Sequence, residues 1–216
     1  MTAVVRSAPP VASALLAALV ASAVRPAPAR ADHDIAANAS FWAYSADGQH
    51  FLVHIDDENR GIVLAVKQVG RQASVHEVVA GDVPPEALVR SPPLVDYQFV
   101  DPGVKTPDSP DAKVKILTSP APTTLQVFMT DGENMTPMFS LPLRRSGHTG
   151  EYAKAAVKEV VWNRTGHSGV IIVDQVVSGP YAMDVDQVIS FPALPYRQKL
   201  AAKRKAAAGG AKGPAR

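Results

Sequence analysis

Residues 41–69 read FWAYSADGQHFLVHIDDENRGIVLAVKQV, and this stretch decides the fold class. Within it, Phe51, Val53 and Ile55 alternate with His50, Leu52, His54 and Asp56, which is the period of a β-strand. Turn-forming residues flank that strand on both sides, and a further apolar segment lies beyond each turn. The stretch therefore predicts an antiparallel meander with strands over 41–45, 51–56 and 62–69.

The same period continues through much of the chain. We expect further strands over 73–80, 113–118, 124–130, 135–143, 155–162, 169–177 and 181–191. Pro137 and Pro142 mark 135–143 as an edge strand, because proline cannot donate to a ladder. One helical turn is expected over 85–88, and a proline-rich loop over 101–111. The fold class predicted is mainly β, with antiparallel meanders in a sandwich or irregular two-sheet domain over 32–192.

Three expected turns share a form, in which an aromatic residue stands four positions before a glycine. They are Tyr44–Gly48, Phe128–Gly132 and Trp162–Gly166. The aromatic side chain holds the strand in the core, the Asp present in the first two closes the turn, and glycine accepts a positive φ. The form resembles the aromatic-Ser-Pro-Asp-Gly hairpin of TolB-like propeller blades, although Ala46 stands where that family has proline. That resemblance implies an alternative, a small β-propeller-like fold.

A second resemblance is to a bacterial family of predicted secreted proteins of unknown function. Its members open with a Ser-Pro-Asp-Gly-type hairpin after an export signal and close with a Trp-containing hairpin before a Gly-Pro turn. The matching pieces here are Ser45–Phe51, Trp162–Gly166 and Gly179-Pro180, about a quarter of the chain after its leader. The resemblance implies export and a β-rich fold, and it brings no activity.

Residues 1–31 have the form of a secretory signal peptide. Arg6 gives a positive start, 11–24 is an unbroken run of apolar and small residues, and Ala29-Arg30-Ala31 is a small-x-small cleavage site. The run is too short for a bilayer-spanning helix, which needs about 20 residues. We therefore expect an exported protein, periplasmic or secreted, that begins at Asp32. The chain has no cysteine, which excludes disulfides, thiolate zinc sites and a cysteine nucleophile.

Charge is divided unevenly along the 216 residues, although the formal net charge is only +2. All twenty acidic residues lie between Asp32 and Asp186, whereas seven basic residues and no acidic one follow Phe191. Residues 193–216 form a basic Ala/Lys-rich tail, expected as a short helix or as a frayed extension with too few apolar residues to pack. Its cations could hold an anionic envelope surface, a polyanion, or the acidic body itself. The residues predicted to bind an anionic partner are Arg197, Lys199, Lys203, Arg204 and Lys205.

One hairpin offers metal-ligand chemistry. His50, His54 and Asp56 share a face of one strand, and Asp57 and Glu58 follow in the turn. However, positions i and i+4 of a strand are roughly 13 Å apart, too far for one ion, so a polar face opposite Phe51 and Val53 is the simpler interpretation. We predict no metal site and no cofactor, and these five residues are the candidates if a divalent cation binds.

No catalytic constellation is recognisable in the sequence. Residues 166–169 read GHSG, but the nucleophile-elbow pattern needs a glycine where Val170 stands. The leading hypothesis is a non-catalytic envelope or secreted protein that contacts a partner through loops and the basic tail. The alternatives are a hydrolase-type enzyme with a site built from loops, and a divalent-cation binder through the His50–Glu58 hairpin.

Overall fold

The computed structural model describes residues 35–36, 38–145, 150–177 and 183–210. The expected leader and the turn at 178–180 lie outside the described residues. The chain is mainly β, with antiparallel strands and one longer helix at its C-terminal end, as predicted. No helix among the described residues is long and apolar enough to cross a membrane.

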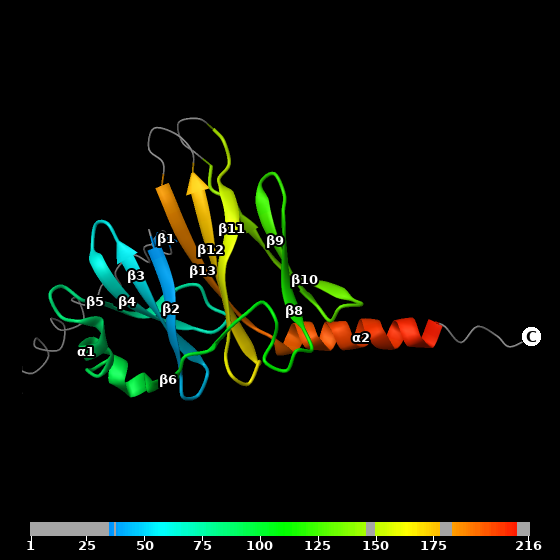
Figure 1. Cartoon of the computed structure of the whole chain (residues 1–216), viewed down its shortest axis with the longest axis horizontal. Coiled ribbons are helices and arrows are strands. Elements are labelled where there is room, and N and C mark those ends of the chain that lie inside the picture. Colours follow the sequence, from blue (N-terminus) through cyan, green and yellow to red (C-terminus); the bar gives the residue numbers. More distant parts are fainter. Residues whose placement is uncertain (1–34, 37, 146–149, 178–182, 211–216) are drawn as a thin grey trace, which may run out of the picture. The chain divides into compact units, whose positions relative to one another are not determined.

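The described strands form three antiparallel sheets (Figure 1). The first sheet has the order β5-β4-β3-β2-β6, the central sheet β1-β13-β12-β11-β7 and the small sheet β10-β9-β8. The first sheet contains β2 (Asn38–Ser45), β3 (His50–Asp57), β4 (Gly61–Gln68), β5 (Ser74–Val79) and β6 (Phe99–Asp101). The central sheet contains β1 (Ile35–Ala36), β7 (Val104–Lys105), β11 (Lys154–Trp162), β12 (Ser168–Val177) and β13 (Met183–Pro192). The small sheet contains β8 (Lys115–Pro120), β9 (Thr124–Thr130) and β10 (Met135–Pro142).

The central sheet is buried on both of its faces. On one face, Val170, Ile172 and Val188 pack with the core of the first sheet around Phe41, Phe51 and Val53. On the other face, residues of β11–β13 pack against the small sheet and the C-terminal helix; they include Trp162, Ile171, Val173, Ile189 and Phe191. This arrangement explains why 170–173 is a continuous aliphatic run instead of an alternating one.

The opening meander is confirmed. The bounds of β2, β3 and β4 differ from the expected ones by at most three residues. The edge position of β10 is also as predicted. The expectation of a loop throughout 101–111 is wrong in one respect, because β7 within it pairs with Val161 and Trp162. A strand of two residues between prolines could not be predicted, because so short a segment shows no periodicity.

The outer face of the first sheet is partly covered. Helix α1 (Pro85–Val89) and the 3₁₀ helix η1 (Leu94–Tyr97) form a third apolar cluster with Leu52, Leu64 and Val66. Leu94 is 1% exposed and Leu52 is fully buried. The interpretation of this face as a polar one does not hold for Leu52, which lies between His50 and His54 and packs against Leu94 and Tyr97 of η1.

Three turns are closed by the same hydrogen bonds, although only two of them carry the aromatic-to-glycine pattern described in the sequence. They run over 45–50, 109–114 and 163–168. In each, a Ser or Asn carbonyl accepts from the residue three positions on, and its side-chain oxygen accepts from the N–H five positions on. The residue three positions after the Ser or Asn has a positive φ in each turn: Gly48 (+67°), Ala112 (+53°) and Gly166 (+68°). The propeller-like hairpin thus has a copy at Ser109-Pro110-Asp111-Ala112, where alanine stands in the glycine position.

Replacing Ala112 with glycine is expected to stabilise the protein by about 0.5–1 kcal/mol. Ala112 is exposed and adopts a left-handed conformation that costs an L residue energy, whereas glycine adopts it without a Cβ clash. Urea unfolding of the purified variant would measure the gain. The matched control is Ala46→Gly in the equivalent first turn, where φ is not positive, and a gain of the same size there would contradict the explanation.

Candidate functional site

The basic C-terminal segment forms a helix that is anchored to the body at its beginning. Helix α2 (Leu194–Gly210) packs against β9 and β10, with Leu200 2% exposed and Tyr196 against the same core. The expectation that the tail has too few apolar residues to pack is therefore wrong for its first two turns. A single leucine and one aromatic ring at helical spacing suffice, because the edge of the small sheet provides the surface.

Three of the five predicted partner-binding cations are held by the body itself. Arg197 donates to both carboxylate oxygens of Asp111, at 2.7 and 3.2 Å. Arg204 donates to Asp131 at 2.9 Å, and Lys203 donates to the Met135 carbonyl oxygen at 2.6 Å. Of the anionic partners considered for these cations, the acidic body is therefore one that they contact.

Electrostatics favours this docking. The Arg197 guanidinium holds the pKa of the Asp111 carboxyl far below its usual range, with help from the Ser109 hydroxyl. The backbone N–H of Asn134 lowers the pKa of Asp131, and Arg204 adds to the effect. Both carboxylates also close turns, so each fixes a turn and a cation of α2 at once.

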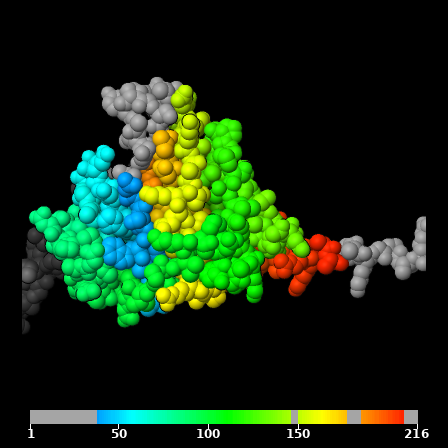
Figure 2. Space-filling view, viewed as in Figure 1, coloured from blue at the N-terminus to red at the C-terminus, as the bar shows by residue number. Residues whose placement is uncertain are grey.

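The other two cations stay available. Lys199 extends over the ring of Tyr196, 5.6 Å from its centroid, and Lys205 lies on the exposed last turns of the helix. Figure 2 shows α2, in red, projecting from the side of the small sheet. Residues 201–208 are all exposed, so this part of the helix presents its surface to solvent.

The metal-ligand candidates are not brought together. The ring of His50 packs edge-on against Tyr97 at 5.0 Å between centroids, while His54 lies against Trp42 at 6.4 Å. Asp57 accepts from the N–H groups of Asn59 and Arg60 and so closes its own turn. Asp56 and Glu58 are at the hairpin end, with Glu58 exposed. Among the described residues, no group of three or more His, Asp or Glu side chains could hold a metal ion.

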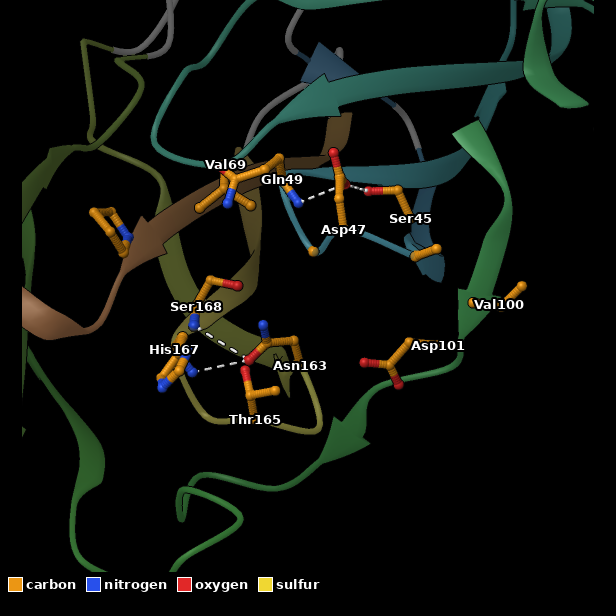
Figure 3. Close-up of a pocket in the computed structure, with 13 residues that line it drawn as sticks. Ser45, Asp47, Gln49, Val69, Val100, Asp101, Asn163, Thr165, His167 and Ser168 are labelled. Atoms are coloured by element: carbon orange, nitrogen blue, oxygen red, sulfur yellow. Dashed lines mark hydrogen bonds between the residues drawn. The ribbon is translucent and has the colours of Figure 1, made fainter. Parts of the chain in front are cut away.

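A pocket of about 280 Å³ lies between the first and third of the shared turns (Figure 3). Its wall includes the turn at 45–49, the end of β6 and the turn at 163–168. The two turns are close neighbours, since a Cβ built on Gly48 would lie 3.4 Å from the Asn163 amide nitrogen. His167, Ser168 and two carboxylates, of Asp47 and Asp101, line the pocket, so this is where loop-built hydrolytic chemistry would have to lie.

The two carboxylates of the pocket hold the backbone, whereas the buried Ser168 hydroxyl has no hydrogen-bond partner among the described residues. Asp47 accepts from the Ser45 hydroxyl and the Gln49 N–H, and these bonds lower its pKa. Asp101 accepts from the N–H groups of Gly103 and Arg164 and pairs with the Arg164 side chain at 3.3 Å. Neither carboxylate bonds to His167, whose exposed side chain lies in the turn just before the buried Ser168 at the start of β12. The arrangement closes turns and does not assemble a nucleophile with a base.

Tyr44 joins the first and central sheets. Its hydroxyl donates to the Val161 carbonyl oxygen at 2.9 Å, and its side chain is fully buried. Burial raises the pKa of this phenol well above its usual range, and the negative charge of Asp101 adds to the rise. Tyr44 therefore stays neutral, and its hydrogen bond links the first sheet to the central sheet.

Comparisons with protein-family models, with curated proteins and with solved structures find no match to this chain.

Proposed function

We propose that this chain is an exported, non-catalytic interaction protein of the bacterial envelope or its surroundings, which contacts an anionic surface through the outer side of α2. The observation that carries the proposal is that the cations of this helix fall into two groups, one bound to the body and one exposed. Arg197, Lys203 and Arg204 fasten it to the body, whereas Lys199 and Lys205 face solvent. No acidic residue follows Asp186, so nothing in the later sequence neutralises these charges.

The leader over 1–31 supports the exported part of the proposal, and the engaged carboxylates of the pocket support the non-catalytic part. A helix with few apolar residues on its outer side suits adsorption through charge better than insertion into a membrane. Each lysine near an anionic lipid surface contributes about 1 kcal/mol, so several act together to give salt-sensitive binding. The sequence places two further cations, Lys212 and Arg216, beyond the described part of the helix.

The test replaces the outward cations and leaves the anchor intact. Removing 196–216 altogether would take Tyr196 and Leu200 out of the core, so the variant is Lys199→Gln with Lys205, Lys212 and Arg216 also changed to Gln. Cosedimentation with vesicles containing phosphatidylglycerol should show at least a tenfold loss of affinity, and wild-type binding should weaken as salt rises.

A matched control changes four exposed cations of the body to Gln: Arg90, Lys105, Lys113 and Lys115. We expect this variant to bind vesicles nearly as well as the wild type. Equal losses in the two variants would show a general charge effect and overturn the role of α2. Wild-type protein that fails to bind these vesicles at low salt would also contradict the proposal, including the case in which it binds only a soluble polyanion.

A further inference from the structure

Two buried side chains place unpaired polar atoms in the pocket between the turns at 45–50 and 163–168. Ser168 is 4% exposed, and its hydroxyl has no hydrogen-bond partner among the described residues. Asn163 is 7% exposed; its Oδ1 accepts from the N–H of Ser168, whereas its Nδ2 donates to no group in the described parts of the chain. Figure 3 shows both atoms directed into the space between the two turns. Since an unpaired buried polar group is costly, the two atoms indicate a polar occupant.

The Asp101 carboxylate lies on the other side of the same space and is turned toward it (Figure 3). It accepts from the N–H groups of Gly103 and Arg164 and pairs with the Arg164 side chain. A carboxylate has about four acceptor positions, so one position of Asp101 is left for a ligand. The pocket therefore presents two groups that can donate, an amide and a hydroxyl, opposite an acceptor.

The rest of the wall is partly apolar. Val69, Val100 and Pro192 line the pocket, and Val100 is 66% exposed, although it is a large aliphatic side chain. The volume of about 280 Å³ is at the small end of ligand pockets, which take about 300–1,000 Å³. Apolar surface beside a few convergent polar groups suits a small ligand that has C–H surface as well as hydrogen-bonding groups.

Charge and hydrogen-bonding capacity narrow the class of ligand. An ammonium group has no lone pair to accept from Asn163, and Arg164 already neutralises Asp101. A carboxylate ligand has no proton to donate to Asp101, and it would meet the negative charge of Asp47 as well. A hydroxyl group both donates and accepts, and two neighbouring hydroxyls offer one oxygen to each of Asn163 and Ser168. A single peptide unit has only one acceptor atom for these two groups.

We propose that this pocket binds a neutral saccharide, with two neighbouring hydroxyls of one sugar ring held by Asn163, Ser168 and Asp101. The Asn163 amide donates to one hydroxyl oxygen, the Ser168 hydroxyl bonds to the next, and one of the two hydroxyls donates to the Asp101 carboxylate. The C–H surface of the ring lies against the apolar part of the wall. The role is binding alone, and it is independent of the anionic surface proposed for α2.

The test is an NMR titration of the purified, isotope-labelled protein with the methyl α-glycopyranosides of glucose, mannose and galactose. These three sugars differ in the directions of their hydroxyls, and at least one should bind with a dissociation constant of about 1 mM, as a few hydrogen bonds give. The amide signals of 45–49 and 163–168 should move with saturation. The same glycoside with its hydroxyls methylated cannot donate to Asp101, so it should bind about tenfold more weakly.

Three further probes represent the excluded classes: ethylammonium, acetate and the neutral amide N-acetylglycine N-methylamide. None of them should move the pocket signals at the concentration that saturates the glycoside. If one of the three binds in the pocket and no glycoside does, the saccharide is the wrong ligand. The inference is also overturned if none of the glycosides binds, which would leave the pocket to water, or if their binding moves only signals outside the pocket.

Two serine variants separate binding from stability. Ser168→Ala removes a hydroxyl that has no partner among the described residues, so it should weaken glycoside binding about tenfold without lowering the urea midpoint. The matched control is Ser109→Ala, in the equivalent turn outside the pocket, where the hydroxyl donates to Asp111 and accepts from the Val114 N–H. That variant should lower the midpoint and leave glycoside binding unchanged. Equal glycoside affinity in Ser168→Ala and the wild type would contradict the inference.

A third variant changes the amide without opening its turn. Asn163→Asp retains the Oδ1 that accepts from the N–H groups of His167 and Ser168, and it replaces the Nδ2 donor with a second acceptor. We expect it to fold and to lose glycoside binding about tenfold or more, because a hydroxyl oxygen then has no donor at this position. Full binding by a folded Asn163→Asp variant would show that the amide does not hold the sugar.

Discussion

Replacing Gly169 with alanine should lower the free energy of unfolding by about 3 kcal/mol, close to the upper end for overpacked cores. A Cβ on Gly169 would lie 2.3 and 2.7 Å from two ring atoms of Phe191, on the neighbouring strand β13. Phe191 is 2% exposed and packs edge-on against Trp162 with ring centroids 5.3 Å apart, so it has no space to move into. Guanidinium unfolding followed by tryptophan fluorescence would measure the loss.

Two further variants separate this clash from a general effect of losing glycine. Gly81→Ala meets nothing within 4 Å and introduces only backbone strain at a positive φ, so it should cost about 1 kcal/mol. Phe191→Leu makes room for the added methyl group. The double variant Gly169→Ala with Phe191→Leu should therefore be more stable than the sum of the two single losses predicts, and simple additivity would contradict the clash.

Replacing Asp186 with alanine should cost about 3 kcal/mol, because it removes a buried carboxylate that three strands share. Asp186 is 2% exposed and accepts from the Ala39 N–H of β2 and from Lys158 of β11, both at 2.6 Å. A β-bulge between Val157 and Glu159 sets Lys158 out of the regular ladder and directs it to this carboxylate. Denaturant unfolding of the variant would show the loss as a lower midpoint with an unchanged m-value.

The control is an ion pair of the same type at the surface. Glu77→Ala breaks the pair between Arg60 and Glu77, whose side chains are about one-third exposed, and it should cost less than about 1 kcal/mol. Lys158→Met leaves the Asp186 carboxylate buried and without its cation, so it should also be strongly destabilising. If Asp186→Ala proved as mild as Glu77→Ala, the shared carboxylate would not join the three strands as described.

Much of the fold could be predicted because its signals are local. The alternation from Phe51 to Ile55 and the prolines of β10 depend only on neighbouring residues, and the structure agrees with both. The shared turn at Ser109 was missed because Ala112 stands in the glycine position, and the aromatic residue that precedes the other two turns is absent. What could have revealed it is the Ser-x-Asp spacing common to 45–47 and 109–111.

The candidate site was less predictable, since it depends on contacts between distant parts of the chain. The cations of 197–205 look alike in the sequence, yet Asp111 and Asp131 select Arg197 and Arg204 and leave Lys199 and Lys205 outward. Nothing local distinguishes them, because the distinction comes from which side of α2 meets the small sheet. Likewise, the side chains of His50 and His54 share a face with Leu52, but the cover over that face comes from η1, forty residues later.

The core between the first and central sheets joins residues made early in synthesis to residues made late. Ala39 meets Asp186, and Phe51 packs with Val170 and Val188, so this core cannot close on a growing chain until β13 has emerged. Closing it after so long a separation brings a large loop entropy, which slows the step relative to formation of the hairpins. A nascent chain of this protein should therefore hold local hairpins while this core stays open until β13 has emerged.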